Sequence, residues 1–478
     1  MFNLAQGNSG RLRDRALTFG LLGAAFVLVL GNLEGILELA YAHGLGGDGF
    51  WGWLGIKGLA APYFSHSWFP TDGWWWWKAT RVIDTVVNGL SRDYTITEFP
   101  FFSFLLGDLH PHVSALPLGL LSLGLSLELL RQPRGLSSAW LADNLGLLAA
   151  TALAIGALGF ANSWDLPTYA ALWLVCLAIW AYSATQPWWW LRAAALGGAV
   201  LAGAVLLYFP FYRSFSPQAS GVWPVLGPTT WPVHYLIVWG AFLLPVAYLV
   251  LGQARLLRGA GWGVRGLALG VALAPLVLWT AIALVLAVFG GKPGFGEVAW
   301  RWVKLLPLVA GIALALAIAF GSARRDAPDR QRVFALVLVA VGLGVTYVPE
   351  LFYIRDLFGN RMNTMFKLYY QGWVMISLAA AYGLYCWGWP WGKVLGARSK
   401  EIRDEQPACK PERSEESSQG QEAPSLPSVA QGGAGAAPGN KVWPIATAWA
   451  SALVWGLAMT LLLGALAYPV AAFASRGA

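Results

Sequence analysis

Apolar segments of about twenty residues recur along most of this chain, and they limit how it can fold more than any other feature. A helix needs about 20 apolar residues to cross the hydrocarbon core of a bilayer, whereas a water-soluble core has no use for so many. We therefore predict an all-α, polytopic integral membrane protein with about eleven transmembrane helices. The predicted spans lie near residues 16–38, 113–130, 145–161, 166–184, 192–209, 233–251, 267–289, 304–320, 333–348, 369–388 and 443–469.

The composition supports this class and argues against others. Hydrophobic residues make up 57% of the 478 positions and charged residues 12%, and the 28 Trp are typical of aromatic belts at membrane surfaces. The formal net charge of +8 fits basic cytoplasmic loops, and no basic face with interleaved aromatic residues indicates nucleic-acid binding. Cys176, Cys386 and Cys409 are scattered, so we expect neither a disulfide framework nor a Cys-based zinc site.

The distribution of charge predicts one functional face. Lys and Arg are more frequent in the short connections that lie inside if the N-terminus is cytoplasmic, so the positive-inside rule favours that orientation in the cell membrane. All five His then fall in outer segments or at outer helix ends, and the span centres carry almost no charge. We therefore expect the polar chemistry on the outer face. The nearly uncharged span centres argue against a transport pathway, which would place ionisable groups at membrane depth.

The densest polar motif runs from Glu98 to His112, between two apolar segments. In an extended chain Asp108, His110 and His112 would project on one side, as ligands of a divalent cation such as Mn, Mg or Zn would. Glu98 and Asp108 are candidate catalytic carboxylates. The alternative is that these side chains cap the next membrane helix, with Pro111 in its first turn.

Two further outer segments carry candidate residues. Asp165 lies in a short turn between spans, where it either caps a helix or reaches the same external cavity as Asp108 as a third candidate catalytic carboxylate. Arg213 ends a span on the outside, where it binds a phosphate or anchors the helix at the interface.

Residues 350–373 form a second dense motif that leads from an outer loop into a span. Arg355, Arg361, Asn363 and Lys367 are candidates for binding a substrate phosphate, because guanidinium groups match phosphate oxygens and Lys adds a point charge. A solvated loop with internal Arg–carboxylate pairs is the competing interpretation.

The remaining organisation follows from composition. Residues 39–112 form a long Trp-rich first outer loop, in which Trp74–Trp77, Lys78 and Arg81 are expected in the lipid headgroup region, with or without a bound lipid. Residues 1–391 are predicted to be the polytopic membrane domain, 392–441 a disordered cytoplasmic linker, and 442–478 a C-terminal transmembrane helix.

Three strings together resemble the uncharacterised YYY membrane protein family of archaea and Chloroflexi. They run from Thr97 to His112, from Asn162 to Tyr169 and from Arg361 to Trp373, and the resemblance spans most of residues 1–390. The Tyr-Tyr-Tyr motif that names the family belongs to an upstream region that is absent here. The resemblance implies that this chain is a fragment, an internally started product or one half of a split protein, with a missing N-terminal half or a partner subunit.

The layout of that family is similar to polytopic GT-C-type glycosyltransferases, which use polyprenyl-phosphate sugars at the outer membrane face. The similarity implies that Glu98 or Asp108 is a general base or metal ligand and that His110 and His112 hold a cation or orient the acceptor. Arg361 and Lys367 would then hold the lipid phosphate. The alternatives are a lipid or polysaccharide transporter or flippase, and a non-catalytic membrane subunit.

Overall fold

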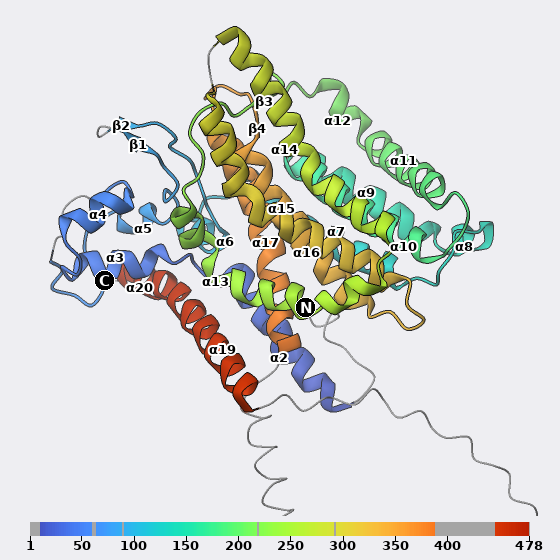
Figure 1. The fold of residues 1–478 in the computed structure, drawn as a ribbon, viewed down its shortest axis with the longest axis horizontal. Helices are drawn as coiled ribbons and strands as arrows, with labels where there is room; N and C mark the ends of the chain where they lie inside the picture. The colour runs from blue at the N-terminus through green and yellow to red at the C-terminus, as the bar shows by residue number, and fades with distance from the viewer. Residues whose placement is uncertain are drawn as a thin grey trace, which may run out of the picture. The chain divides into compact units, whose positions relative to one another are not determined.

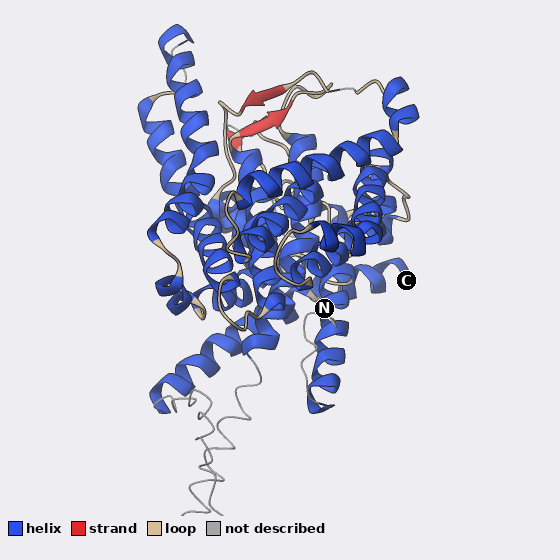
Figure 2. Cartoon of the chain, turned by 90° about the vertical axis from the view of Figure 1, so that its right-hand side faces the viewer, coloured by secondary structure: helices blue, strands red, loops and turns tan. Residues whose placement is uncertain are grey.

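The computed structural model describes residues 10–59, 64–87, 90–217, 219–290, 293–387 and 445–477, in which helices provide nearly all of the regular structure (Figures 1 and 2). The helices are α2 (Gly10–Leu28), α3 (Glu34–Ala42), α4 (Asp48–Leu54), α5 (Trp75–Lys78), α6 (Pro100–Leu106), α7 (Pro111–Arg131), α8 (Ser138–Asp143), α9 (Leu145–Ala161), α10 (Asp165–Ser183), α11 (Trp189–Leu207), α12 (Phe209–Ser214), α13 (Pro232–Leu251), α14 (Trp262–Gly290), α15 (Phe295–Ala323), α16 (Arg330–Tyr347), α17 (Met362–Trp387), α19 (Ile445–Ala465) and α20 (Ala467–Gly477). Two 3-10 helices, η1 (Ala254–Gly259) and η2 (Val348–Glu350), complete the helical elements of the described chain.

The strands of the described residues are short and form two antiparallel pairs. β1 (Val86–Val87) pairs with β2 (Leu90–Ser91), and β3 (Val222–Pro224) pairs with β4 (Phe352–Ile354). In the second pair Trp223 lies opposite Tyr353, so a segment before α13 is joined to the segment between α16 and α17. This pair covers the end of the helix bundle at which α17 begins.

The predicted all-α membrane fold is confirmed. Eight helices of the described chain are long and apolar enough to cross a membrane, compared with about eleven predicted spans. The two apolar helices Leu17–Leu28 and Leu145–Ala161 are shorter, and α17 is 26 residues long but rich in polar and aromatic side chains. Nearly every predicted span therefore corresponds to a helix, whether or not the helix is apolar enough to count as a crossing.

The predicted first span, 16–38, is wrong because the helix breaks in its middle. α2 ends at Leu28 and α3 begins at Glu34. The amide groups between them bond elsewhere, from Gly31 N to Ala465 O and from Leu33 N to Ile237 O, both at 3.0 Å. Asn32 donates to Ala79 O at 2.6 Å and accepts from Glu34 N at 3.1 Å, which fixes the break. Tertiary hydrogen bonds thus replace the helical ones.

α17 is the central helix of the described bundle and packs against α16, α13 and α2 (Figure 1). A Cβ at Gly383 would lie 2.4 Å from Pro245 O, so a side chain there would hold α17 away from α13. Such small residues allow close helix contact where water cannot drive association. Met375, Ile376 and Ala380 of α17 are also fully buried.

The long Trp-rich loop contains regular structure. Between residues 48 and 106 it contains α4, α5, α6 and the β1–β2 pair. Trp75 and Trp76 are buried, Lys78 lies 3.1 Å from both a Glu38 and an Asp72 oxygen, and Arg81 faces Glu98. In this structure the two cations thus face protein carboxylates.

The chain divides into two compact units. One contains Met1–Trp387 and Ala458–Ala478, and the other Gly388–Leu457. The predicted linker, 392–441, lies outside the described residues. The predicted boundary at residue 442 separates α19 and α20 from the first domain, whereas α20 and the end of α19 belong to the first unit.

Replacing Gly35 with Ala tests how α20 is held within this unit. The new Cβ would lie 2.5 Å from Tyr468 Cβ and 2.6 Å from its Cα, so we expect the free energy of unfolding to fall by about 1–3 kcal/mol. Chemical denaturation in one detergent measures this change. Gly198→Ala, in α11, is the control because its Cβ would meet nothing within 4 Å, and we expect no loss there. Equal stabilities of the two variants would contradict the close contact.

Candidate functional site

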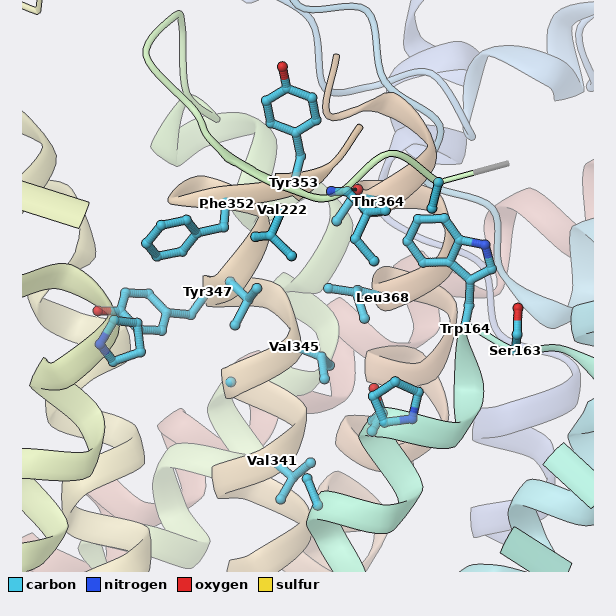
Figure 3. Close-up of a pocket in the computed structure, with 18 of the residues that line it drawn as sticks. Ser163, Trp164, Val222, Val341, Val345, Tyr347, Phe352, Tyr353, Thr364 and Leu368 are labelled. Carbon is cyan, nitrogen blue, oxygen red and sulfur yellow. Dashed lines mark hydrogen bonds between the residues drawn. The ribbon is translucent and has the colours of Figure 1, made fainter. Parts of the chain in front are cut away.

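An apolar cavity of about 590 Å³ lies at the end of the bundle where α10 and α17 begin (Figure 3). Its walls come from α10, α14, α15, α16, α17 and the β3–β4 pair. From Ala340 to Tyr347 it follows α16 for about 10 Å, at 1.5 Å per residue. Figure 3 shows Val341, Val345 and Leu368 along its length. Its volume is within the usual range for a small-molecule site.

Polar groups at the cavity come from the first turns of helices and from the connecting loops. They include Ser163, Thr168, Asp356, Asn363 and Thr364. Asn363 donates to Asp356 Oδ2 at 2.8 Å, and Thr364 Oγ1 accepts from Ile354 N at 2.9 Å. The predicted residue Asn363 therefore lines the cavity, held by its own loop.

A polar cluster, which contains Asp165, Gln371, Lys367 and Glu98, lies on the other side of the turn 163–165 from the cavity. The turn therefore borders both the cluster and the cavity. Trp164 lines the cavity, and its carbonyl accepts from Gln371 Nε2 at 2.9 Å. The same Nε2 lies 2.6 Å from Asp165 Oδ1. On α17, Thr364 and Leu368 face the cavity, while Gln371 reaches Asp165. The spacing of four residues places Thr364 and Leu368 on one face of the helix.

Lys367 is under the electrostatic influence of two carboxylates, Asp165 and Glu98. The electrostatic partners of its ammonium group are these two carboxylates, and the group lies 4.3 Å from the centre of the Phe366 ring. Within the described part of the chain, no carboxylate forms a salt bridge with Lys367. The structure thus brings Glu98, Asp165 and Lys367 together from three predicted motifs that are far apart in sequence.

Glu98 is a mostly buried carboxylate with one cationic neighbour at close range. Arg81 Nη2 lies 3.6 Å from Glu98 Oε1. Burial raises the pKa of Glu98, because it disfavours the charged form, and Arg81, His110 and Lys367 only partly offset this effect. Arg81 is itself held by Tyr94 Oη at 3.0 Å and by Thr80 O at 3.0 Å.

The Asp108–His112 stretch turns into a helix rather than staying extended. Gly107, with φ of 73°, ends α6, and Pro111 opens α7 with His110 as its N-cap. Asp108 Oδ2 pairs with His110 Nδ1, and both side chains are nearly half exposed. His112 is buried instead, with its Nε2 3.5 Å from Ser103 Oγ and its ring 4.4 Å from that of Tyr370. The predicted extended geometry is therefore wrong.

The predicted metal site at Asp108, His110 and His112 stays a prediction. The described residues contain no group of three or more His, Cys, Asp or Glu that could hold a metal ion. The His110 and His112 ring centres are 5.2 Å apart, but His110 already faces Asp108 and His112 faces Ser103. A nitrogen of His110 thus contacts Asp108, and a nitrogen of His112 contacts Ser103.

Arg361 lies at the centre of a buried ion network. Its Nε is 2.9 Å from Asp93 Oδ1, its Nη1 is 2.8 Å from Glu350 Oε1 and 3.2 Å from Pro349 O, and its Nη2 contacts Asp93 Oδ2 and Thr230 Oγ1. These contacts use all five N–H donors of a guanidinium group. Arg361 therefore offers no further donor to a ligand in this arrangement, and its predicted phosphate contact stays untested.

The two other predicted cations lie apart from this network. Arg355 is exposed at the β3–β4 pair, with its guanidinium 4.8 Å from the centre of the Trp223 ring. Arg213 is exposed on α12, and its side chain makes no hydrogen bond or ion pair within the described residues. Their predicted roles in binding phosphate stay predictions.

Several site residues were not predicted from the sequence as part of the site. Arg81, Tyr370 and Gln371 contact the predicted residues, and Asp93 and Thr230 hold Arg361. Tyr370 and Gln371 stand within the second dense motif, which could have indicated them. Asp93 and Thr230 lie in unremarkable loops, so only the tertiary structure reveals them.

Residues 1–376 match the model of an uncharacterized membrane protein family, DUF2298, and the chain belongs to that family. No curated protein and no solved structure matches.

Proposed function

We propose that this DUF2298 protein is a membrane enzyme that transfers a sugar from a lipid-linked donor, such as a polyprenyl-phosphate sugar. The observation that carries the proposal is the shared wall of the apolar cavity and the polar cluster. Trp164 borders the cavity while Asp165 and Gln371 belong to the cluster, so one amphipathic molecule can reach both. A lipid chain suits the aliphatic walls, and a phosphate suits the Lys367 ammonium group.

The chemistry needs a base for the acceptor hydroxyl and a cation for the leaving phosphate. In the proposed mechanism His110 is neutral and donates its Nδ1 proton to the adjacent Asp108, so that Nε2 accepts the proton of the acceptor. The acceptor oxygen then bonds to the anomeric carbon as the bond from that carbon to the phosphate oxygen breaks. The proton goes to His110, and Lys367 stabilises the lipid phosphate that leaves. Glu98 and Asp165 are the carboxylates that favour the charged form of Lys367.

The orientation that supports this proposal puts the cluster on the extracytoplasmic face. Arg131 ends α7, Arg324 and Arg325 follow α15, and Arg330 begins α16, all at the helix ends opposite the cluster. The positive-inside rule favours a cytoplasmic position for such arginines. A partner subunit or N-terminal half that supplies further acidic groups is compatible with this site.

A direct assay uses vesicles that contain the purified protein and a radiolabelled polyprenyl-phosphate sugar, with membrane extract as the source of acceptor. We expect protein-dependent movement of the label into a new covalent product. Label that crosses the bilayer on unchanged lipid would instead support a flippase. If neither outcome is seen with the purified protein alone, and the protein depends on a co-purified partner, the results would support a non-catalytic subunit.

Gly344→Leu tests whether the cavity holds the lipid part of the donor. Gly344 lines the cavity, and a Cβ there would meet nothing within 4 Å, so the leucine side chain has room only by filling the cavity. We expect KM for the lipid-linked donor to rise at least about tenfold, since a few lost methylene contacts of about 0.8 kcal/mol each account for that factor. Initial rates over a range of donor concentrations measure it.

Gly198→Leu is the matched control, because Gly198 also stands on an apolar helix with nothing within 4 Å of its Cβ. It lies outside the cavity lining and should leave KM unchanged. A normal KM for Gly344→Leu would argue against a lipid in the cavity even if sugar transfer itself is observed.

A further inference from the structure

A second cavity lies at the arginine-rich end of the bundle, away from the helix ends that form the proposed active site. Its volume is about 300 Å³, and it is lined by Arg255, Leu256, Gly259, Gly321, Arg324 and Arg325. The walls are η1 on one side and the C-terminal end of α15 on the other. We propose that this cavity binds the phosphate headgroup of an anionic phospholipid.

The backbone fixes the two walls against each other. η1 packs on α15, and a Cβ at Gly321 would lie 2.8 Å from Ala260 Cβ. Ala260 is buried, and its amide bonds to Leu257 O at 3.0 Å. The arginines therefore stand on a packed frame, which keeps them at one cavity although their side chains are exposed.

The arginines at this cavity are not neutralised by salt bridges in the described part of the chain. Within the described residues no carboxylate forms an ion pair with Arg255, Arg324 or Arg325. The nearby Asp329 is paired with Arg332 at 3.1 Å. Arg134 adds to the positive charge, because one of its guanidinium nitrogens donates to Arg325 O. Three like charges around one small volume repel each other, so an anion between them lowers the free energy.

The donors of these arginines are largely available to a ligand. Arg324 uses its Nε for Tyr182 O, at 3.3 Å, and its guanidinium stacks 3.7 Å from the centre of the Tyr182 ring. That contact orients the group and leaves both Nη nitrogens without a described partner. The side chains of Arg255 and Arg325 donate to no protein group in the described residues. Planar guanidinium groups match phosphate oxygens with two parallel hydrogen bonds.

The surroundings favour a lipid as the source of the phosphate. The cavity lies where α14 begins and α15 ends, and both helices are apolar and long enough to cross a bilayer. A site at the end of membrane-spanning helices is at headgroup depth, and the exposed apolar side chains of α14, such as Leu267 and Leu269, continue from there along the acyl region. Leu256 in the lining also suits the glycerol part of a lipid better than free phosphate.

The experiment measures binding of phosphatidylglycerol and phosphatidylcholine to the detergent-purified protein by native mass spectrometry. We expect saturable binding of phosphatidylglycerol and little binding of phosphatidylcholine. The triple variant Arg255→Gln, Arg324→Gln, Arg325→Gln should bind phosphatidylglycerol at least about tenfold more weakly, because several charge-assisted hydrogen bonds are lost. Phosphatidylglycerol should also raise the unfolding temperature of the wild type but not of this variant.

The control carries the same loss of charge at exposed arginines outside the cavity, Arg92→Gln, Arg131→Gln and Arg192→Gln. It should bind phosphatidylglycerol like the wild type. Because Arg324 also contacts Tyr182, the double variant Arg255→Gln, Arg325→Gln serves if the triple variant does not fold. Equal binding by the wild type and the cavity variants would overturn the proposal. The lipid assignment would be overturned if inorganic phosphate displaces the lipid and, without any lipid, raises the unfolding temperature by itself.

Discussion

Replacing Arg361 with Met should lower the free energy of unfolding by about 3–5 kcal/mol, the usual cost of removing one partner from a buried ion pair. Arg361, Glu350 and Asp93 are almost fully buried, and the guanidinium group binds both carboxylates. Without it two carboxylates remain desolvated and close to each other. The network also joins the loop at Asp93 to η2 and the start of α17, so its loss should loosen the end of the bundle that holds the site.

Chemical denaturation in a single detergent measures this effect against Arg355→Met. Arg355 is exposed and makes one cation–π contact, so we expect a loss of about 1 kcal/mol or less. Adding Asp93→Asn and Glu350→Gln to Arg361→Met should restore part of the stability, because no buried charge then lacks a partner. Equal losses in Arg361→Met and Arg355→Met would show that the network contributes little.

Replacing His110 with Gln should reduce sugar transfer by about 10²–10⁴-fold, the usual contribution of a general base. The proposed function assigns proton transfer to this imidazole, which Asp108 orients. Glutamine keeps a hydrogen-bonding group at the N-cap of α7 but cannot accept a proton at neutral pH. Because His110 is nearly half exposed, the free energy of unfolding should hardly change.

The measurement compares kcat and KM for the labelled donor with the same values for His66→Gln. His66 is an exposed histidine in the first outer loop, so its replacement should leave both constants unchanged. A fall in kcat with little change in KM is expected for His110→Gln, since the group acts in the transition state. If His110→Gln transfers sugar at the wild-type rate while the wild type is active, the base is another residue.

Most of the helices could be predicted from the sequence, because spanning a bilayer imposes a length of about twenty apolar residues on each segment. α7, α9, α10, α11 and α13 correspond closely to predicted spans. The break between α2 and α3 could not be predicted in this way. It depends on hydrogen bonds from Gly31 and Leu33 to residues more than 200 positions away, which leave no periodic pattern.

The candidate site divides in the same way. The sequence identified Glu98, Asp108, His110, Asp165 and Lys367 by their polar character among apolar neighbours, since such residues are costly near a membrane. It did not separate an exposed cation from a buried one. Arg355 and Arg361 look alike in the sequence, but burial and two carboxylates distinguish Arg361.

The sequence by itself determined that this chain is a helical membrane protein with polar motifs grouped at one end of its helices. Those properties depend on local hydrophobicity and charge, which the order of residues states directly. Only the tertiary structure decided which motifs meet, where the cavity lies and how Arg361 is paired. Asp93 and Arg361 are 268 positions apart, and contacts over such distances depend on how all the helices pack together.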